Sequence, residues 1–541
     1  MVANRFLEYH QVVMILKYPG LQVDQQMVLR RRSIDSVKRH TMKTLCIFII
    51  SFLYSGLLQA QYRANFHLDS NLAGYTLGDT VNRNTAYKDS VYQDTVHNKY
   101  GDLRNDKAEF NKQYPLWSVA LKVTGANVFT SLVDRYLFNY DFSRIGFNSW
   151  NHNIKTGWEW DQDRFGMNFI IHPYSGSAFF NAARSSGYNF WGSAPFAALG
   201  SLEWEYFGEN TLPSYNDIIN TTVNGIFLGE VTYRIGSDIL DDRTTGFDRF
   251  CREFSVFVLS PTRAFSRFTQ GKMFRVTSEE IYQTEPLNIM LSLGARAVNH
   301  GSSFLTGPSN FLLSINLDYG NPFELRSRKP FDFFKLKIDL TKVTDTGRKI
   351  LDNIIGFGVL YGGNVHDGRL DMLVGGFQHF DYYDNKTFEL ATIAFGPGII
   401  TKLKVSPNSS LYTNFHIALV PFAGNSTRFG PDTTQIRDYD FGGGAESKLE
   451  CTVNLGSWIG FTFIGSYYWF HAWVGDEEDH YIGILKPSIG LRLFDYLSIG
   501  IEHLVYYSDR YTRNFGNFHE VRTEQRVQLT YYFENFKQEK K

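Results

Sequence analysis

The chain has 541 residues, a formal net charge of -1, and a composition that is 43% hydrophobic and 16% aromatic. A charge so near zero gives no reason to expect a nucleic-acid partner, and no nucleic-acid motif is present. The 46 Gly, 32 Tyr and 47 Phe are typical of a membrane β-barrel, because half of each strand faces lipid and half faces a polar lumen. The cysteines Cys46, Cys251 and Cys451 lack C-x-x-C spacing, which argues against a disulfide framework or a zinc site.

A secretory signal peptide is predicted at residues 42–60. The run that starts at Met42 has a basic residue, an apolar core from Leu45 to Leu58 and the small residue Ala60, which is the layout of such a peptide. Residues 1–41 resemble no targeting segment, so we expect Met42 to be the start. No later run reaches the roughly 18 apolar residues of a membrane-spanning helix, which argues against the inner membrane as the destination.

Residues 61–111 are polar and without a sustained period, and we expect them to form a loosely ordered periplasmic lead-in. Residues 112–275 are predicted to form a helical domain that plugs or caps the strands beyond it. Within this domain, 116–138 fits either a helix or a pair of strands, and 154–171 fits a hairpin or a helix-entry segment.

Several local signals place helices in this domain. Ser214 and Asp217 have the form of an N-cap pair, and Pro261 follows Ser260 as the first residue of a further helix. Gly225 and Gly229 form G-x-x-x-G, which allows another backbone to approach closely. On the same helix, an alternating-sign ladder is formed by Glu230, Arg234 and Asp238.

From Leu287 the hydrophobic period becomes two and stays there. About twelve segments of this kind, each long enough to cross a bilayer at a tilt, are separated by turn clusters. An even number of antiparallel strands can close without leaving an edge. The predicted fold is therefore mainly β: a transmembrane antiparallel barrel over 276–533, with a polar tail at 534–541. A water-soluble β-sandwich is the alternative, but the signal peptide and the strand length favour a membrane barrel.

The last strand, Arg526 to Phe533, alternates Val527, Leu529 and Tyr531 with polar residues and ends on an aromatic. Such an ending resembles the assembly signal of bacterial outer-membrane barrels. The expected partners are outer-membrane lipids and, through this strand, the outer-membrane assembly machinery.

The stretch His172 to Ser193, H-P-Y-S-G-S-A-F-F-N-A-A-R-S-S-G-Y-N-F-W-G-S, supports a more specific comparison. Together with the later runs G-S-L-E-W-E-Y-F-G-E and G-I-F-L-G-E-V-T-Y-R, this stretch resembles a family of uncharacterised bacterial outer-membrane proteins that share a domain of unknown function. The resemblance covers about 168–275 and extends into the barrel at G-G-F-Q-H-F-D-Y-Y-D-N, 375–385. It implies an architecture and a location, but no reaction or ligand.

The candidate catalytic residues are His172, Glu203, Glu205 and Glu209. A histidine with several carboxylates can supply a general base or hold a divalent metal. Against this, no H-E-x-x-H spacing occurs and Asp217 is already explained as a helix cap, so we predict no metal and no cofactor. Ser175 or Ser177 near His172 could act as a nucleophile, since Tyr174–Ala178 is a degenerate form of G-x-S-x-G, but helix capping explains these serines more simply.

Arg184, Arg263 and Arg267 are candidate binding residues. They could grip phosphates of lipopolysaccharide, or they could pair with the acidic residues that precede them. We favour internal pairing, because buried charges need partners.

The sequence thus predicts an outer-membrane barrel, reached by secretion to the periplasm, with a helical region that packs in or beneath the lumen. Its role would be structural, binding or gated passage. The alternative is an envelope hydrolase that modifies lipid or glycan through His172 and the glutamates.

Overall fold

The computed structural model describes residues 112–533, apart from 279, 283–284, 343–349, 386–387, 427–438, 476 and 514–515. These residues belong to one compact unit, Thr76–Lys541. The predicted signal peptide (42–60), lead-in (61–111) and tail (534–541) lie outside the described residues.

The first part of the described chain is helical, as predicted. The Ser214 hydroxyl accepts a hydrogen bond from the Asp217 backbone N–H at 3.3 Å and so caps the longest helix. Residues 116–136 form a helix rather than two strands, and 154–171 leads into a helix. In chain order the helices are α4 (Leu116–Tyr136), α5 (Phe147–Thr156), η1 (Met167–Ile171), α6 (His172–Arg184), α7 (Phe190–Glu203), η2 (Trp204–Gly208), α8 (Tyr215–Ile239), α9 (Gly246–Leu259) and α10 (Pro261–Thr269).

The second part is a closed barrel of twelve antiparallel strands, which confirms the predicted fold. Each strand pairs with its neighbour in sequence, and β1 closes on β12 with Ile289 opposite Phe533. The strands are β1 (Leu287–His300), β2 (Ser309–Tyr319), β3 (Phe334–Lys342), β4 (Leu351–Asp367), β5 (Leu370–Asp384), β6 (Glu389–Ser406), β7 (Ser409–Ser426), β8 (Tyr439–Leu455), β9 (Ile459–Val474), β10 (Glu478–Phe494), β11 (Leu497–Thr512) and β12 (Gly516–Phe533).

The barrel has two unlike rims. The proximal rim, where β1 begins and β12 ends, carries the two-residue turns 368–369, 407–408 and 495–496. The proximal rim also carries the longer connection 320–333 between β2 and β3, and the distal rim carries 301–308 between β1 and β2. In outer-membrane barrels the short turns are periplasmic and the long loops are extracellular.

The two faces of the wall have opposite chemistry. On β8, Leu449 and Val453 point outward and are exposed, whereas Lys448 points inward to the Asp381 and Glu446 carboxylates. On β12, Val527 and Leu529 are half exposed while Arg526 is buried inside. An apolar exterior around a charged interior is the reverse of a water-soluble sandwich and fits a barrel wrapped by hydrocarbon. Other exposed apolar residues of the strands include Leu293, Phe415, Ile417, Phe461, Phe463, Leu485, Ile489, Leu491, Ile499 and Ile501.

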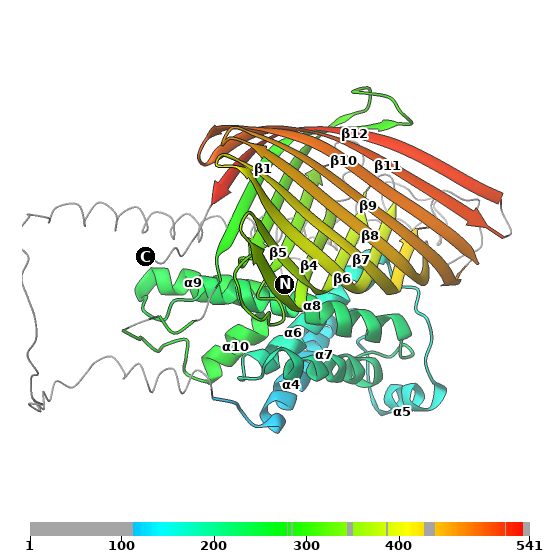
Figure 1. The fold of residues 1–541 in the computed structure, drawn as a ribbon. Helices are drawn as coiled ribbons and strands as arrows, with labels where there is room; N and C mark the ends of the chain where they lie inside the picture. Colours follow the sequence, from blue (N-terminus) through cyan, green and yellow to red (C-terminus); the bar gives the residue numbers. More distant parts are fainter. Residues whose placement is uncertain are drawn as a thin grey trace, which may run out of the picture. The chain divides into compact units, whose positions relative to one another are not determined.

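The helices pack against one side of the outer wall of the barrel, which corrects the expectation of a plug in or beneath the lumen (Figure 1). Phe227 on α8 packs on Phe380 of β5, with ring centroids 5.6 Å apart. Since neighbouring residues of a strand point to opposite faces, and Asp381 binds Lys448 and Tyr468 inside, Phe380 faces out. The lumen is filled by charged strand residues, so the aromatic side chains of the helices pack on the apolar outside instead.

Helix α4 is long and apolar enough to cross a membrane by length and composition. The sequence expectation that no such segment follows the signal peptide is therefore corrected. The difference arises because Ser, Thr, Gly and Asn interrupt the apolar residues of α4, so no continuous run exists although the mean hydropathy is high.

Candidate functional site

Five polar side chains gather where α6 and α8 begin, and we call them the polar cluster: Asp161, Asn168, His172, Asn216 and Asp217. The Asn216 amide donates to Asp161 Oδ1 at 2.7 Å and to Asp217 Oδ1 at 2.9 Å. The Asn168 amide also donates to Asp161 Oδ1, at 3.0 Å. His172 Nε2 lies 3.4 Å from Asp217 Oδ1. The histidine predicted to be catalytic thus faces Asp217, whose backbone N–H is capped by the Ser214 hydroxyl.

Glu205 lies beside this cluster and is only 1% exposed. Its Oε2 accepts a hydrogen bond from the Ser214 backbone N–H at 2.7 Å. Burial, together with the nearby Glu209 carboxylate, holds the pKa of Glu205 well above its usual value. Burial lowers the pKa of His172 to about 4. At neutral pH the imidazole is therefore uncharged and resists protonation.

The other two predicted glutamates, Glu203 and Glu209, make contacts outside the polar cluster. Glu203 accepts hydrogen bonds from Thr124 at 3.0 Å and from Asn127 at 3.2 Å, which ties α4 to α7. The Glu209 backbone carbonyl accepts from the Asn153 amide at 3.1 Å, and burial raises the pKa of its carboxyl. The structure brings Glu205 and Glu209 into one acidic region but gives His172 a different partner.

The polar cluster is sealed against the barrel wall near the distal rim. The Asn168 amide donates to the Tyr439 hydroxyl, which itself donates to the Asp163 carbonyl at 2.8 Å. Phe169 lies against Phe422 and Phe441 of the outer wall. The cluster thus satisfies its hydrogen bonds within the protein and packs against aromatic rings of the wall.

Sequence reasoning missed Asp161, Asn168 and Asn216. Asn168 and Asn216 carry amide side chains, and a buried amide needs a hydrogen-bond partner. An amide next to apolar residues was therefore the sequence signal that could have pointed to them. The partner of Asn168 is Tyr439, far away in the sequence, and only the fold brings these two residues together.

The predicted nucleophiles are used within their own helix. The Ser175 hydroxyl donates to the Ile171 carbonyl at 3.3 Å, and the Ser177 hydroxyl donates to the Tyr174 carbonyl at 2.7 Å. Both are back-bonds to the preceding turn rather than N-caps. No contact between His172 and either hydroxyl is found among the described residues.

The three candidate binding arginines are paired internally. Arg184 grips Glu230 through two hydrogen bonds of 2.7 and 3.0 Å, and Arg234 holds the same carboxylate at 2.8 Å. Arg267 pairs with Asp242 at 2.8 Å and with Glu253 at 2.7 Å. Arg263 donates to the Tyr233 carbonyl and, at 2.8 Å, to the Ser237 hydroxyl.

The lumen contains a second network of charges, which we call the lumen network. Arg526 pairs with Asp339 at 2.9 Å and with Glu524 at 2.6 Å. Arg296 binds Asp352 at 2.8 Å. The Tyr468 hydroxyl donates to Asp381 at 2.8 Å, next to Lys448. These pairs join strands that are distant in the sequence, so periodicity could indicate inward-facing charges but not their partners.

The lumen is not equally filled along its length. On β10 the inward side chains Glu478, His480 and Ile482 are buried, whereas Lys486 and Arg492, nearer the proximal rim, are half-buried. The same change occurs on β8, from buried Asp440 and Glu446 to half-buried Glu450. On these two strands the inward side chains are thus more deeply buried in the distal half than in the proximal half.

One group at the distal end of the lumen has metal-ligand chemistry. The ligand atoms of Asp440, Glu478 and His480 lie within 4.8 Å of one another. However, Arg510 pairs with Glu478, and His480 is hydrogen-bonded to both Glu478 and Asn425. A cation would have to displace Arg510, so these groups belong to the lumen network.

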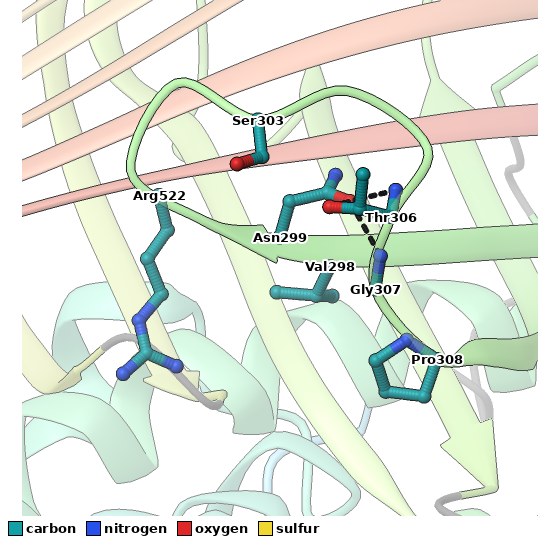
Figure 2. A pocket seen from close by; sticks show the side chains of 7 residues that line it. All are labelled: Val298, Asn299, Ser303, Thr306, Gly307, Pro308 and Arg522. Carbon is teal, nitrogen blue, oxygen red and sulfur yellow. Dashed lines mark hydrogen bonds between the residues drawn. The ribbon is translucent and has the colours of Figure 1, made fainter.

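A pocket of about 260 Å³ lies at the distal rim, under the connection between β1 and β2. Figure 2 shows the Asn299 amide oxygen accepting hydrogen bonds from the backbone of Thr306 and Gly307, both at 2.7 Å. Asn299 is thus used to hold the connection in place. The lining is Val298, Asn299, Ser303, Thr306, Gly307, Pro308 and Arg522.

A closed barrel of twelve antiparallel strands with an apolar exterior and a charged interior defines an outer-membrane β-barrel protein. Residues 157–262, which include the polar cluster and Arg184, match a family model described as "Domain of unknown function (DUF3943)". No curated protein matches the chain.

Solved barrels are similar to this chain at low identity. The NanC porin is 8% identical, with 44% of this chain and 98% of that one covered, at a TM-score of 0.26. The outer membrane channel DcaP of Acinetobacter baumannii is 7% identical, with 46% and 96% covered, at 0.22. An anion-selective porin from Comamonas acidovorans is 10% identical, with 46% and 98% covered, at 0.21. The barrel assignment rests on the strand pairing and burial of this chain itself.

Proposed function

We propose that this protein is secreted to the periplasm and inserted in the outer membrane, where it has a structural or binding role and does not form an open passage. The lumen network supports this proposal, because Arg526, Tyr468 and Lys448 place paired side chains in the interior of the barrel. Buried charges that satisfy one another are not replaced by water without loss of those pairs.

Two kinds of partner are expected at the surfaces of such a barrel. Outer-membrane lipids surround the exposed apolar wall, and the outer-membrane assembly machinery recognises the last strand, which ends at Phe533. Both are expectations from the chemistry of these surfaces.

Planar-bilayer recording of the purified protein tests the closed lumen. We expect no steady conductance from the wild type. The double variant Lys448→Ala/Tyr468→Ala removes two blocking side chains and should conduct. Lys404→Ala is the control, because its side chain is 56% exposed near the proximal rim. A wild-type protein with stable, ohmic conductance would overturn the proposal of a closed barrel.

A different measurement distinguishes the proposed structural or binding role from the alternative, a lipid- or glycan-modifying hydrolase. If His172 and Glu205 are structural, His172→Ala and Glu205→Ala lower the folding yield or the heat stability. If instead either variant folds with unchanged stability while mass spectrometry shows changed envelope lipids or glycans, the structural role of the cluster is refuted.

A further inference from the structure

The helical region buries polar side chains and exposes apolar ones. Asn181, Asn220, Asn224 and Glu230 are 0% exposed. The exposed set is large and apolar, which is the reverse of the surface of a water-soluble domain. Its members on the helices include Trp117 (67%), Leu121 (62%), Phe129 (68%), Trp191 (59%), Phe250 (56%) and Phe265 (56%).

Helix α9 shows the pattern most clearly. Phe247, Phe250, Phe254 and Phe257 recur at three- and four-residue spacing, and successive rings lie 6.0–6.2 Å apart. The opposite face carries charges that pair inward, such as Glu253 with Arg267. The phenylalanine surface continues on α10 through Phe265 and Phe268. An exposed aromatic face backed by buried ion pairs is typical of a helix that lies against lipid.

The contact between α6 and α8 is also of the kind used by membrane helices. A Cβ on Gly176 would lie 1.7 Å from the Thr221 carbonyl oxygen, and one on Gly225 would lie 2.6 Å from Gly176 Cα. The two backbones therefore touch. Helices in lipid associate through small residues of this kind, because apolar side chains gain little by leaving hydrocarbon for one another.

Helix α8 crosses the outside of the barrel wall from β8, past β5, to β2. Near its start, Asn216 bonds Asn168, which bonds Tyr439, the first residue of β8 at the distal rim. Near its end, Arg234 lies over the ring of Tyr319, the last residue of β2 at the proximal rim. With 25 residues the helix is about 37 Å long, which matches the roughly 30 Å of a hydrocarbon core when the helix is tilted.

The helical region therefore packs on the outward face of the same wall whose other outward residues are exposed and apolar. We propose that helices α4 and α7–α10 lie in the membrane beside the barrel, and that lipid acyl chains cover their exposed apolar surface. This inference rests on the proposed outer-membrane location. Helix α8 packs on the outer wall through the buried contact of Phe227 with Phe380, so the exposed apolar surface of the helices lies beside the wall that faces lipid.

Tryptophan quenching in vesicles tests the proposal. Four variants each keep one tryptophan and replace the others by phenylalanine, in phosphatidylcholine vesicles with or without bromine on the acyl chains. Trp117 and Trp191 report on the helices, and Trp469, outward and 41% exposed on β9, reports on the barrel. Trp160, packed between the helices and the wall against Phe422 and Phe441, is the shielded control.

We expect brominated lipid to quench Trp117 and Trp191 at least half as strongly as Trp469, and aqueous iodide to quench all three weakly. If Trp469 is quenched by bromine while Trp117 and Trp191 respond only to iodide, the helices face water and the inference is overturned. If both are shielded from either quencher, protein covers them and the inference also fails. If Trp469 itself escapes bromine, the membrane barrel is what fails.

A second measurement uses the unaltered chain, in case the single-tryptophan variants fold poorly. Wild-type protein is reconstituted with phosphatidylcholine that carries a diazirine on its acyl chain, illuminated and digested. Mass spectrometry should find label on peptides from α4 and α9 as well as on β9–β12. Label confined to the strands would contradict the proposal.

Discussion

The role of an individual glutamate in this protein depends on the groups that surround its carboxyl. Glu205 and Glu203 lie two residues apart, yet one is enclosed beside other acids and the other joins two helices at a half-exposed position. From the sequence both were candidate catalytic acids. The alternation of acidic and apolar residues was visible, but the enclosing groups come from other segments, so the distinction could not be predicted.

The pH dependence of stability should reflect Glu205. A carboxyl whose folded pKa is raised favours the folded state while it is protonated, and this contribution is lost as the pH rises above the unfolded value. Glu205→Gln should therefore unfold at the same denaturant concentration as the wild type near pH 4 and at a higher one at pH 8. His172 acts oppositely, since its lowered pKa of about 4 costs stability as the pH falls from 6.5.

Glu203→Gln is the matched control for this experiment, because the Glu203 side chain is half-exposed and bonds Thr124 and Asn127 instead of lying among other acids. Equal shifts for both variants at both pH values would contradict the role assigned to Glu205.

Removal of the Glu230 carboxylate should be strongly destabilising. It leaves the half-buried Arg184 and Arg234 without their counter-ion, and breaking a buried pair costs about 3–5 kcal/mol. We expect Glu230→Ala to lose that much in denaturant unfolding. Arg243→Ala is the comparison, because the Arg243 side chain is 43% exposed, and it should change stability little. Similar losses in the two variants would show that Glu230 is not a buried partner.

At the scale of the elements, helix contacts depend on a few glycines. Gly225 was predicted to permit close approach, and it does so against Gly176 on α6. Gly176→Ala should force α6 away from α8 and lower the thermal stability of the helical region, measured by circular dichroism. Gly125→Ala on α4 is the control, since a Cβ there meets nothing within 4 Å, and it should be neutral or slightly stabilising. A neutral Gly176→Ala would mean that the two helices do not touch.

The sequence predicts the two faces of each strand, but it does not predict where the helices pack. Alternation along 449–455 or 527–533 names both faces of a strand, because lipid and lumen demand opposite residues. The spacing of Phe247, Phe250 and Phe257 likewise marks a face of a helix, but it does not say whether core, lipid or barrel covers that face. The position of α8 on the wall depends on contacts such as Phe227 with Phe380, between residues far apart in the chain.

For the whole molecule, the lumen network should control the stability of the barrel. Arg526→Ala leaves Asp339 and Glu524 enclosed without their shared cation. We expect a lower temperature at which the folded band is lost on a detergent gel. Arg513→Ala provides the comparison, because its side chain is 71% exposed in a surface pair with Glu477, and such pairs contribute little. An unchanged transition for Arg526→Ala would mean that the network does not hold the strands together.

The contact between helices and wall has a consequence for the order of assembly. Helix α8 and its neighbours touch β2, β5, β7 and β8 through Tyr319, Phe380, Phe422 and Tyr439, all of which precede the final strands. At the seam between β1 and β12, the outward residues Leu293, Val527 and Leu529 are exposed. The helices can therefore pack on β2 to β8 while the sheet is still open. Strands β1 and β12 can then pair last, and their pairing does not disturb the helix contacts.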